Sequence, residues 1–150
     1  MKNNFKKLQR EQIFAAFESG QPFPVSMLPG KESALRKALG ITQGQMAKRL
    51  GTKQSSFNRT ESALDTAELQ TIARVAKELN CEVLITFKPA GTFEEFIRKH
   101  ALIRAEKILK RTYSNMALEE QAPDNSAYEK RLKELTDELS EKADSSIWED

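Results

Sequence analysis

The side chains best suited to a chemical task gather between residues 43 and 61, where amides, hydroxyls and cations recur at helical spacing. A glutamine stands at residue 43, and a polar, cationic group follows on the next expected helix. Its members are Thr52, Lys53, Gln54, Ser55, Ser56, Asn58 and Arg59. Amides and guanidinium groups form the hydrogen bonds that read base edges, and cationic and hydroxyl side chains contact phosphates. This composition favours a surface that binds double-stranded DNA in its major groove.

Two short helices joined by a tight turn would place these side chains on one surface. Met46 and Leu50 lie four residues apart and can face one core, and Gly51 follows where the chain must turn. We expect Thr52 to cap the second helix and Phe57 to return to the core. The polar side chains then stay outside, as in a helix-turn-helix with an exposed recognition helix. The alternative is an ordinary helix pair with a solvated polar face, but the order of the residues favours DNA binding.

The helix that carries Gln43 is expected to begin after a capping Thr42. At that place the Gln43 side chain can hydrogen-bond a DNA phosphate, and the helix dipole adds to the attraction. The alternative is a surface glutamine without a partner. The glutamine is therefore a candidate contact mainly because of the motif around it.

Further helices are predicted on both sides of this motif. Residues 4–18 form an amphipathic helix, and residues 21–30, which hold three prolines, form a linker. A helix over residues 31–39 is expected to turn Leu39 inward and Arg36 outward. Another helix follows over residues 67–79, which makes a compact helical module.

Residues 81–89, CEVLITFKP, change to a period of two, with Val83, Ile85 and Phe87 on one side. This pattern predicts a β-strand. A strand needs a partner for its backbone amides. The partner is either the segment 21–30 or the same strand in a second copy, and the prolines favour the second copy. Such a pair would set two recognition helices on successive major grooves.

Two helices are predicted in the C-terminal part. A long helix begins at Thr92, and a final helix covers residues 126–143 with an apolar stripe along one side. A break around Pro123 separates them. The stripe is most often core or a dimer seam, and the alternative is a groove for a partner protein. Residues 90–150 are therefore expected to serve dimerisation or partner binding.

Charge is distributed unevenly along the chain. Residues 1–60 hold 11 lysines and arginines against 3 acidic residues, a net charge of +8, whereas residues 61–150 have a net charge of −6. A basic half that carries the motif suits a polyanion such as DNA. Most of the negative excess lies in residues 116–150, with 4 basic and 11 acidic side chains. This acidic end is expected to point away from phosphates.

The composition fits a soluble, helix-rich protein of 150 residues, with 39% hydrophobic and 31% charged residues. The sequence contains no apolar run of about 18 residues, so no membrane span is expected. The start, MKNNFKKLQREQ, is amphipathic and does not resemble a secretory signal. Cys81 is the only cysteine, so no intrachain disulfide is expected. Together these features favour the cytoplasm.

The sequence does not favour an enzyme. It shows no glycine-rich phosphate loop, no paired nucleophile and base, and no metal-ligand spacing. His100, the only histidine, is expected to be a surface or half-buried helix residue, and Cys81 is expected to pack in the core. We therefore expect no catalytic residues, no cofactor and no metal site.

The segment LGITQGQMAKRLGTKQSSF, followed by Glu61, resembles the Xre or phage-repressor-like helix-turn-helix family. The wider chain resembles the mobile mystery protein A family through KLQREQ, ALRKALGITQGQMAKRL, ELNCEVLITFKP, NMALEEQ and the closing tryptophan. Members of that family are encoded beside a Fic-domain protein. The resemblance therefore implies a transcriptional repressor that autoregulates its operon and serves as antitoxin to an adenylylating Fic enzyme.

The resemblance also implies roles for particular residues. Gln43 and Gln54 match the phosphate- and base-contacting glutamines at the two helix starts. Further positions on the DNA-facing side are matched by Lys53, Ser55 and Arg59. Thr60 departs from the pattern, because the motif usually has a larger aliphatic residue there.

Together these observations predict a mainly α protein with a five-helix Xre or lambda-repressor-like helix-turn-helix core, one β-strand over about residues 81–89 and a C-terminal helical extension. Three regions are expected: an N-terminal helix with its linker (1–30), the DNA-binding domain with its strand (31–89), and the helical C-terminal region (90–150). The expected function is a sequence-specific repressor that binds a palindromic operator as a homodimer. The alternative is an interaction module whose acidic C-terminal helices inhibit a Fic-domain partner, with DNA binding secondary.

Overall fold

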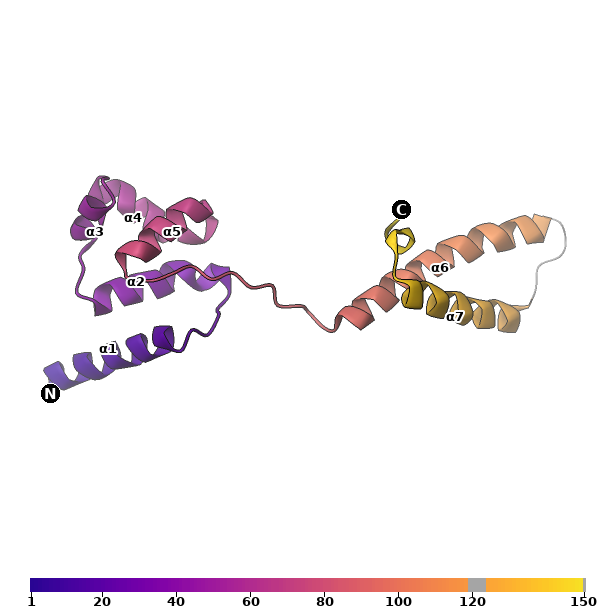
Figure 1. Cartoon of the computed structure of the whole chain (residues 1–150), viewed down its shortest axis with the longest axis horizontal. Coiled ribbons are helices and arrows are strands. Elements are labelled where there is room, and N and C mark those ends of the chain that lie inside the picture. Colours follow the sequence, from indigo (N-terminus) through magenta and orange to yellow (C-terminus); the bar gives the residue numbers. More distant parts are fainter. Residues whose placement is uncertain (119–123, 150) are drawn as a thin grey trace. The chain divides into compact units, whose positions relative to one another are not determined.

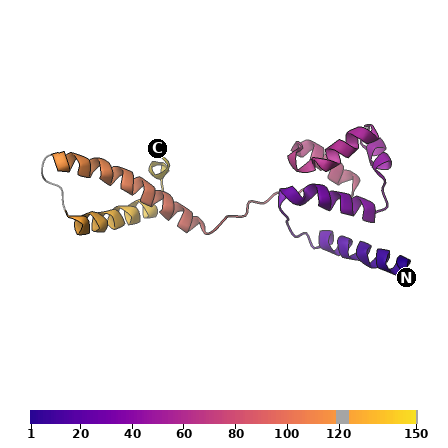
Figure 2. The same ribbon diagram turned by 180° about the vertical axis from the view of Figure 1, so that it is seen from behind.

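The structure of the protein, a computed structural model, describes residues 1–118 and 124–149. The chain divides into two compact units, Met1–Thr86 and Phe87–Asp150, and both consist of helices (Figures 1 and 2). Within the described residues no helix combines the length and apolar character that crossing a membrane requires.

The first unit consists of five α-helices and two short 3-10 helices. They are α1 (Lys2–Glu18), η1 (Val25–Met27), α2 (Leu28–Ala38), α3 (Gln43–Arg49), α4 (Gln54–Ser62), η2 (Leu64–Thr66) and α5 (Leu69–Glu78). The largest fully buried side chains are those of Met46, Phe57, Leu64 and Val75. The core thus lies where α3, α4, η2 and α5 meet, and α1 covers it through partly buried side chains near its C-terminal end.

Local sequence signals set the ends of the motif's helices. Thr42 Oγ1 accepts from the backbone N–H of Gln45 at 3.1 Å, and Gln45 Oε1 accepts from the backbone N–H of Thr42 at 2.9 Å. This reciprocal capping box confirms the predicted cap at Thr42. Gly51, with φ +68°, ends α3, and the backbone N–H of Thr52 donates to the carbonyl of Ala47 at 2.9 Å. That bond closes the turn in the pattern of a Schellman motif.

Three predictions about this region are wrong. The residue before α4 that serves as its N-cap is Lys53, without a side-chain hydrogen bond, so Thr52 does not cap the helix. Arg36 is only 4% exposed and points inward, because it has a buried acidic partner in Glu61. Leu39 was expected inside and is 43% exposed, because α2 ends at Ala38 and the chain turns away there.

The predicted strand is also wrong: the described residues contain helices and no β-strand. The segment 82–90 has no regular structure, because none of the described backbone pairs with it. Cys81 and Val83 pack against the helical core, whereas Ile85 and Phe87 are 62% and 95% exposed. The alternating pattern reflects helix-core packing at its start and exposed side chains beyond. Without this strand, the predicted dimer formed by pairing of two strands has no structural support.

The second unit is a helical hairpin. Its elements are α6 (Phe93–Leu118), α7 (Asn125–Lys142) and the 3-10 helix η3 (Ser145–Trp148). The helices α6 and α7 lie side by side in Figures 1 and 2. Thr92 caps α6, with its Oγ1 accepting from the backbone N–H of Glu95 at 3.1 Å. The predicted break around Pro123 lies outside the described residues.

Small side chains let the two helices of the hairpin approach closely. Ala101 and Ala105 are fully buried, and Leu109 and Ile147 are 4% exposed. Beside this core, the rings of Phe96, His100 and Trp148 form a cluster, with the His100 ring edge-on to Phe96 at 4.8 Å and tilted against Trp148 at 4.5 Å between centroids. The histidine is therefore half-buried on a helix, as expected from the sequence.

Candidate nucleic-acid interface

The recognition helix α4 separates its polar side chains from its anchors. On one side, Phe57 is 1% exposed and Glu61 is 6% exposed, so both face the interior. The remaining positions predicted for DNA contact are exposed: Thr52, Lys53, Gln54, Ser55, Ser56, Asn58 and Arg59. The structure therefore places these side chains together along α4 and the turn before it. Gln43, at the start of α3, is half-buried beside them.

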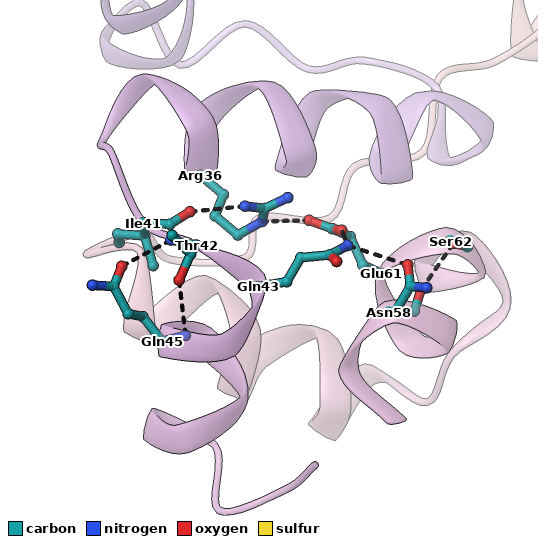
Figure 3. Close-up of polar contacts among 8 residues, drawn as sticks. All are labelled: Arg36, Ile41, Thr42, Gln43, Gln45, Asn58, Glu61 and Ser62. Carbon is teal, nitrogen blue, oxygen red and sulfur yellow. Dashed lines mark hydrogen bonds and ion pairs between the residues drawn. The ribbon is translucent and has the colours of Figure 1, made fainter. Parts of the chain in front are cut away.

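The Gln43 side chain joins α3 to the recognition helix. Its Nε2 donates to Glu61 Oε2 at 2.6 Å and to Asn58 Oδ1 at 3.1 Å (Figure 3). An amide nitrogen carries two N–H groups, and both are engaged here. A side-chain contact from Gln43 to a phosphate would require one of these bonds to be exchanged, so that contact stays a prediction.

Asn58 is oriented by the same bond. Because its Oδ1 accepts from Gln43, the amide nitrogen of Asn58 lies on the side away from that glutamine. The backbone carbonyl of Asn58 accepts from Ser62 Oγ at 2.9 Å. Asn58 thus presents an exposed amide donor in a fixed orientation on α4, and base edges are read by such groups.

A buried ion pair holds α4 against α2. Arg36 Nε donates to Glu61 Oε1 at 2.5 Å, and Arg36 Nη1 donates to the carbonyl oxygen of Ile41 at 2.8 Å (Figure 3). The two side chains of the pair are 5% and 7% exposed. Burial opposes ionisation of Glu61, but hydrogen bonds from Arg36 and Gln43 outweigh it and lower the pKa of Glu61. The pair therefore holds α2 and α4 in one arrangement, and the bond to Ile41 holds the loop that precedes α3.

Sequence reasoning missed a second buried carboxyl beside this pair. Glu32 is 4% exposed and lies on α2, one helical turn before Arg36. Burial, and then the neighbouring Glu61 carboxylate, raise the pKa of Glu32 to about 8, while Arg36 acts in the opposite direction. At pH 7 the protonated, neutral form of Glu32 is therefore favoured. The available signal was its place three residues before Leu35, on the side of the helix expected to face inward.

The side chain of Gln54, the first residue of the recognition helix, lies beside Gly44 of α3. A Cβ atom placed on Gly44 would lie 3.4 Å from Oε1 of Gln54. The Gln54 amide thus extends over the first turn of α3. Gln54 therefore lies beside the residue that follows Gln43 on α3, and DNA contact by these two glutamines stays a prediction.

Thr60, which departs from the family pattern, is accommodated within α4. Its Oγ1 donates to the backbone carbonyl of Ser56 at 3.1 Å, and the residue is half-buried. The hydroxyl is therefore paired, and the methyl group remains available for packing. The apolar side chain by which α4 joins the hydrophobic core is that of Phe57.

The fold and this surface define a helix-turn-helix domain. Residues 33–84 match the model of the helix-turn-helix family, a range that contains α3, α4 and α5 and most of α2. The match confirms the predicted Xre-like domain and supports a DNA-binding, transcription-regulator type of function. No curated protein and no solved structure shows a significant match to the chain.

Proposed function

We propose that the protein is a sequence-specific DNA-binding transcriptional repressor whose helix α4 enters the major groove. The observation that carries this proposal is the two-sided character of α4. Its buried side is anchored by Phe57 and Glu61, and its exposed side gathers amides, hydroxyls and cations. Such a helix can approach base edges without disturbing its own packing.

Different side chains on this surface serve different parts of the contact. Arg59 and Lys53 carry the positive charge that phosphates attract, and a guanidinium also suits the O6 and N7 acceptors of guanine. The amides of Gln54 and Asn58 suit adenine, whose edge offers one donor and one acceptor. Specificity in this proposal comes from Gln54, Asn58 and Arg59.

The repressor acts in this proposal as a homodimer on a palindromic operator, because dimeric helix-turn-helix proteins bind two half-sites about one helical turn apart. The helical hairpin supports a role in pairing. Among its described residues the buried apolar side chains are those of Ala101, Ala105, Leu109 and Ile147. In contrast, Phe93, Phe96 and Trp148 are 68%, 50% and 48% exposed. A second copy would bury these rings, which are the residue types enriched at interfaces.

A second candidate function is inhibition of a partner protein by the hairpin, with DNA binding secondary. The family resemblance suggests a Fic-domain protein as this partner, and the same exposed aromatic side chains support a protein contact. Co-purification of the neighbouring gene product with the wild-type chain, and its loss on Trp148→Ala, would favour this role. Retention of operator binding in that variant would show that the two functions use different surfaces.

The test of the first proposal is binding to the protein's own promoter fragment, titrated against salt, with random DNA as control. Specific binding with a two-fold footprint is expected, and it should exceed binding to random DNA at every salt concentration. Equal affinity for both DNAs, falling together as salt rises, would show only general attraction to phosphates. That result would contradict the proposed repressor function.

A further inference from the structure

We propose that Glu32, acting as a neutral carboxylic acid, is a positioning residue for the DNA-contacting surface: it donates a hydrogen bond to Glu61 and thereby maintains the network that orients Gln43 and Asn58. This inference rests on the proposed DNA-binding function. It goes beyond that function because it makes operator affinity depend on one buried proton.

The Glu32 carboxyl lies in a closed environment. Both of its oxygens are buried, and no donor among the described residues reaches them. The neighbouring group that acts on it is the carboxyl of Glu61, which pairs with Arg36 one helical turn further along α2. Two carboxyl oxygens can hydrogen-bond only when one of them carries a proton. Glu61 is the ionised member, because Arg36 and Gln43 both donate to it.

Glu61, the acceptor of this proton, is connected by further hydrogen bonds to a residue on the surface. Glu61 Oε1 accepts from Arg36, and Oε2 accepts from Gln43 at 2.6 Å. Gln43 in turn donates to Asn58 Oδ1 at 3.1 Å. A change in the position or charge of the Glu61 carboxylate is thus passed through one amide to Asn58, which is exposed on α4.

Loss of the proton would place two negative charges beside one guanidinium. Arg36 would then be shared between Glu32 and Glu61, and the repulsion between the carboxylates would act on Glu61 directly. The hydrogen bond from Gln43 would be strained or exchanged. We therefore expect the ionised form of Glu32 to present Asn58 less well to DNA.

The other elements packed against α2 add no competing charge to this site. Helices α1 and α4 and the 3-10 helices η1 and η2 pack against α2. The charged groups that act on the Glu32 carboxyl are Glu61 of α4 and Arg36 of α2 itself. Residues Val25–Met27 of η1 are uncharged. Of the other charged residues on these elements, Arg59 of α4 is exposed to solvent and Asp65 of η2 is half-buried. Those of α1 are all exposed; they are Lys2, Lys6, Lys7, Arg10, Glu11 and Glu18.

The experiment measures the affinity of the full chain for its promoter fragment from pH 6 to pH 9 at constant ionic strength. The wild type should lose about tenfold in affinity across this range, because one proton coupled to binding changes Kd by up to tenfold per pH unit above the pKa. Glu32→Gln keeps a neutral donor beside Glu61, so its affinity should match that of the wild type at pH 6 and change by less than about twofold by pH 9. Glu18→Gln, an exposed change of the same charge on α1, should retain the wild-type profile.

Two results would overturn the proposal. One is the same pH profile in the wild type and Glu32→Gln, and the other is a folded Glu32→Gln protein that binds weakly at every pH. If this variant does not fold, carboxyl NMR of the wild-type chain decides the question. Titration of Glu32 near pH 8 supports the proposal, and titration near 4.5, the ordinary pKa, contradicts it. If the wild type shows no specific DNA binding, the proposed function fails, while the NMR titration still tests the Glu32 proton.

Discussion

Arg36 and Glu61 form a buried ion pair at 2.5 Å that joins the helix before the helix-turn-helix to the recognition helix. The pair lies directly behind the exposed surface, because Glu61 also accepts from Gln43 at 2.6 Å. In the proposed function, one carboxylate therefore links the stability of the domain to its contact with DNA. Its partners explain why a charged residue occupies the interior of a small helical domain.

Removal of the cation from this pair is predicted to destabilise the domain strongly. In Arg36→Ala two buried carboxyls, Glu61 and Glu32, lose their guanidinium, and uncompensated buried charge typically costs about 3–5 kcal/mol. Urea denaturation followed by circular dichroism measures the change. The control is Arg49→Ala, since Arg49 forms a 3.5 Å pair with Glu78 and is 56% exposed. It should cost about 1 kcal/mol or less. Similar losses in both variants would contradict the importance assigned to the buried pair.

The stability of the domain is predicted to fall as pH rises from about 5 to 8. Glu32 has a folded-state pKa of about 8 against an ordinary value of 4.5. Between these values the folded state binds more protons than the unfolded state, so increasing pH favours unfolding. Denaturation at a series of pH values should show this slope in the wild type and a flatter dependence in Glu32→Gln. A wild-type stability that is constant between pH 5 and pH 8 would be inconsistent with a buried neutral Glu32.

The same measurement should show the opposite dependence in acid. The pKa of Glu61 is lowered in the folded state, so its contribution is present at neutral pH and is lost as pH falls below about 4.5. The two carboxyls together predict a maximum of stability near pH 5. Glu61→Gln should reduce the acid-side loss.

The two threonines that flank the motif are predicted to differ in their effect on stability. Thr42→Ala removes the Oγ1 acceptor of the capping box but keeps the bond from the residue 42 backbone N–H to Gln45, and it should cost about 1 kcal/mol. Thr52→Ala should have little effect, because no side-chain bond caps α4. Thermal or urea unfolding of both variants provides the comparison. A larger loss of stability for Thr52→Ala than for Thr42→Ala would support the cap at Thr52 that the sequence suggested, and it would contradict the structure.

The turn glycine is predicted to require its lack of a side chain. Gly51 has φ +68°, so Gly51→Ala places a Cβ atom in the left-handed region and should cost about 1 kcal/mol. Gly30, inside α2, has open space around its missing Cβ and no positive φ. Gly30→Ala should therefore be neutral or stabilising by about 0.4–1 kcal/mol. If the two variants showed the same unfolding midpoint, backbone conformation would not explain the glycine at the turn.

Local signals allowed much of the helix-turn-helix to be predicted from the sequence. The cap at Thr42, the turn at Gly51 and the buried Phe57 each depend on residues close in the chain. The partnership of Arg36 with Glu61 was not predicted, because the two residues lie 25 positions apart. Nothing in the local pattern distinguishes an exposed arginine from one with a distant buried carboxylate.

The wrong strand prediction has a similar origin. The alternation over residues 81–89 describes the side chains, but a strand also requires a backbone partner. Here Cys81 and Val83 pack against helices instead. The raised pKa of Glu32 could not be predicted from the sequence either, because it depends on burial and on the neighbouring Glu61, and both follow from the tertiary structure.

The most direct measurement compares operator binding by Arg59→Ala and Arg49→Ala at one salt concentration. Both remove one exposed cation, but Arg59 lies on α4, whereas Arg49 is paired with Glu78. We expect Arg59→Ala to lose about 1–3 kcal/mol of binding free energy at the operator. On random DNA its affinity should change little beyond the charge effect seen in Arg49→Ala. Equal losses in both variants, on both DNAs, would show that α4 provides charge alone and would contradict sequence-specific recognition by this helix.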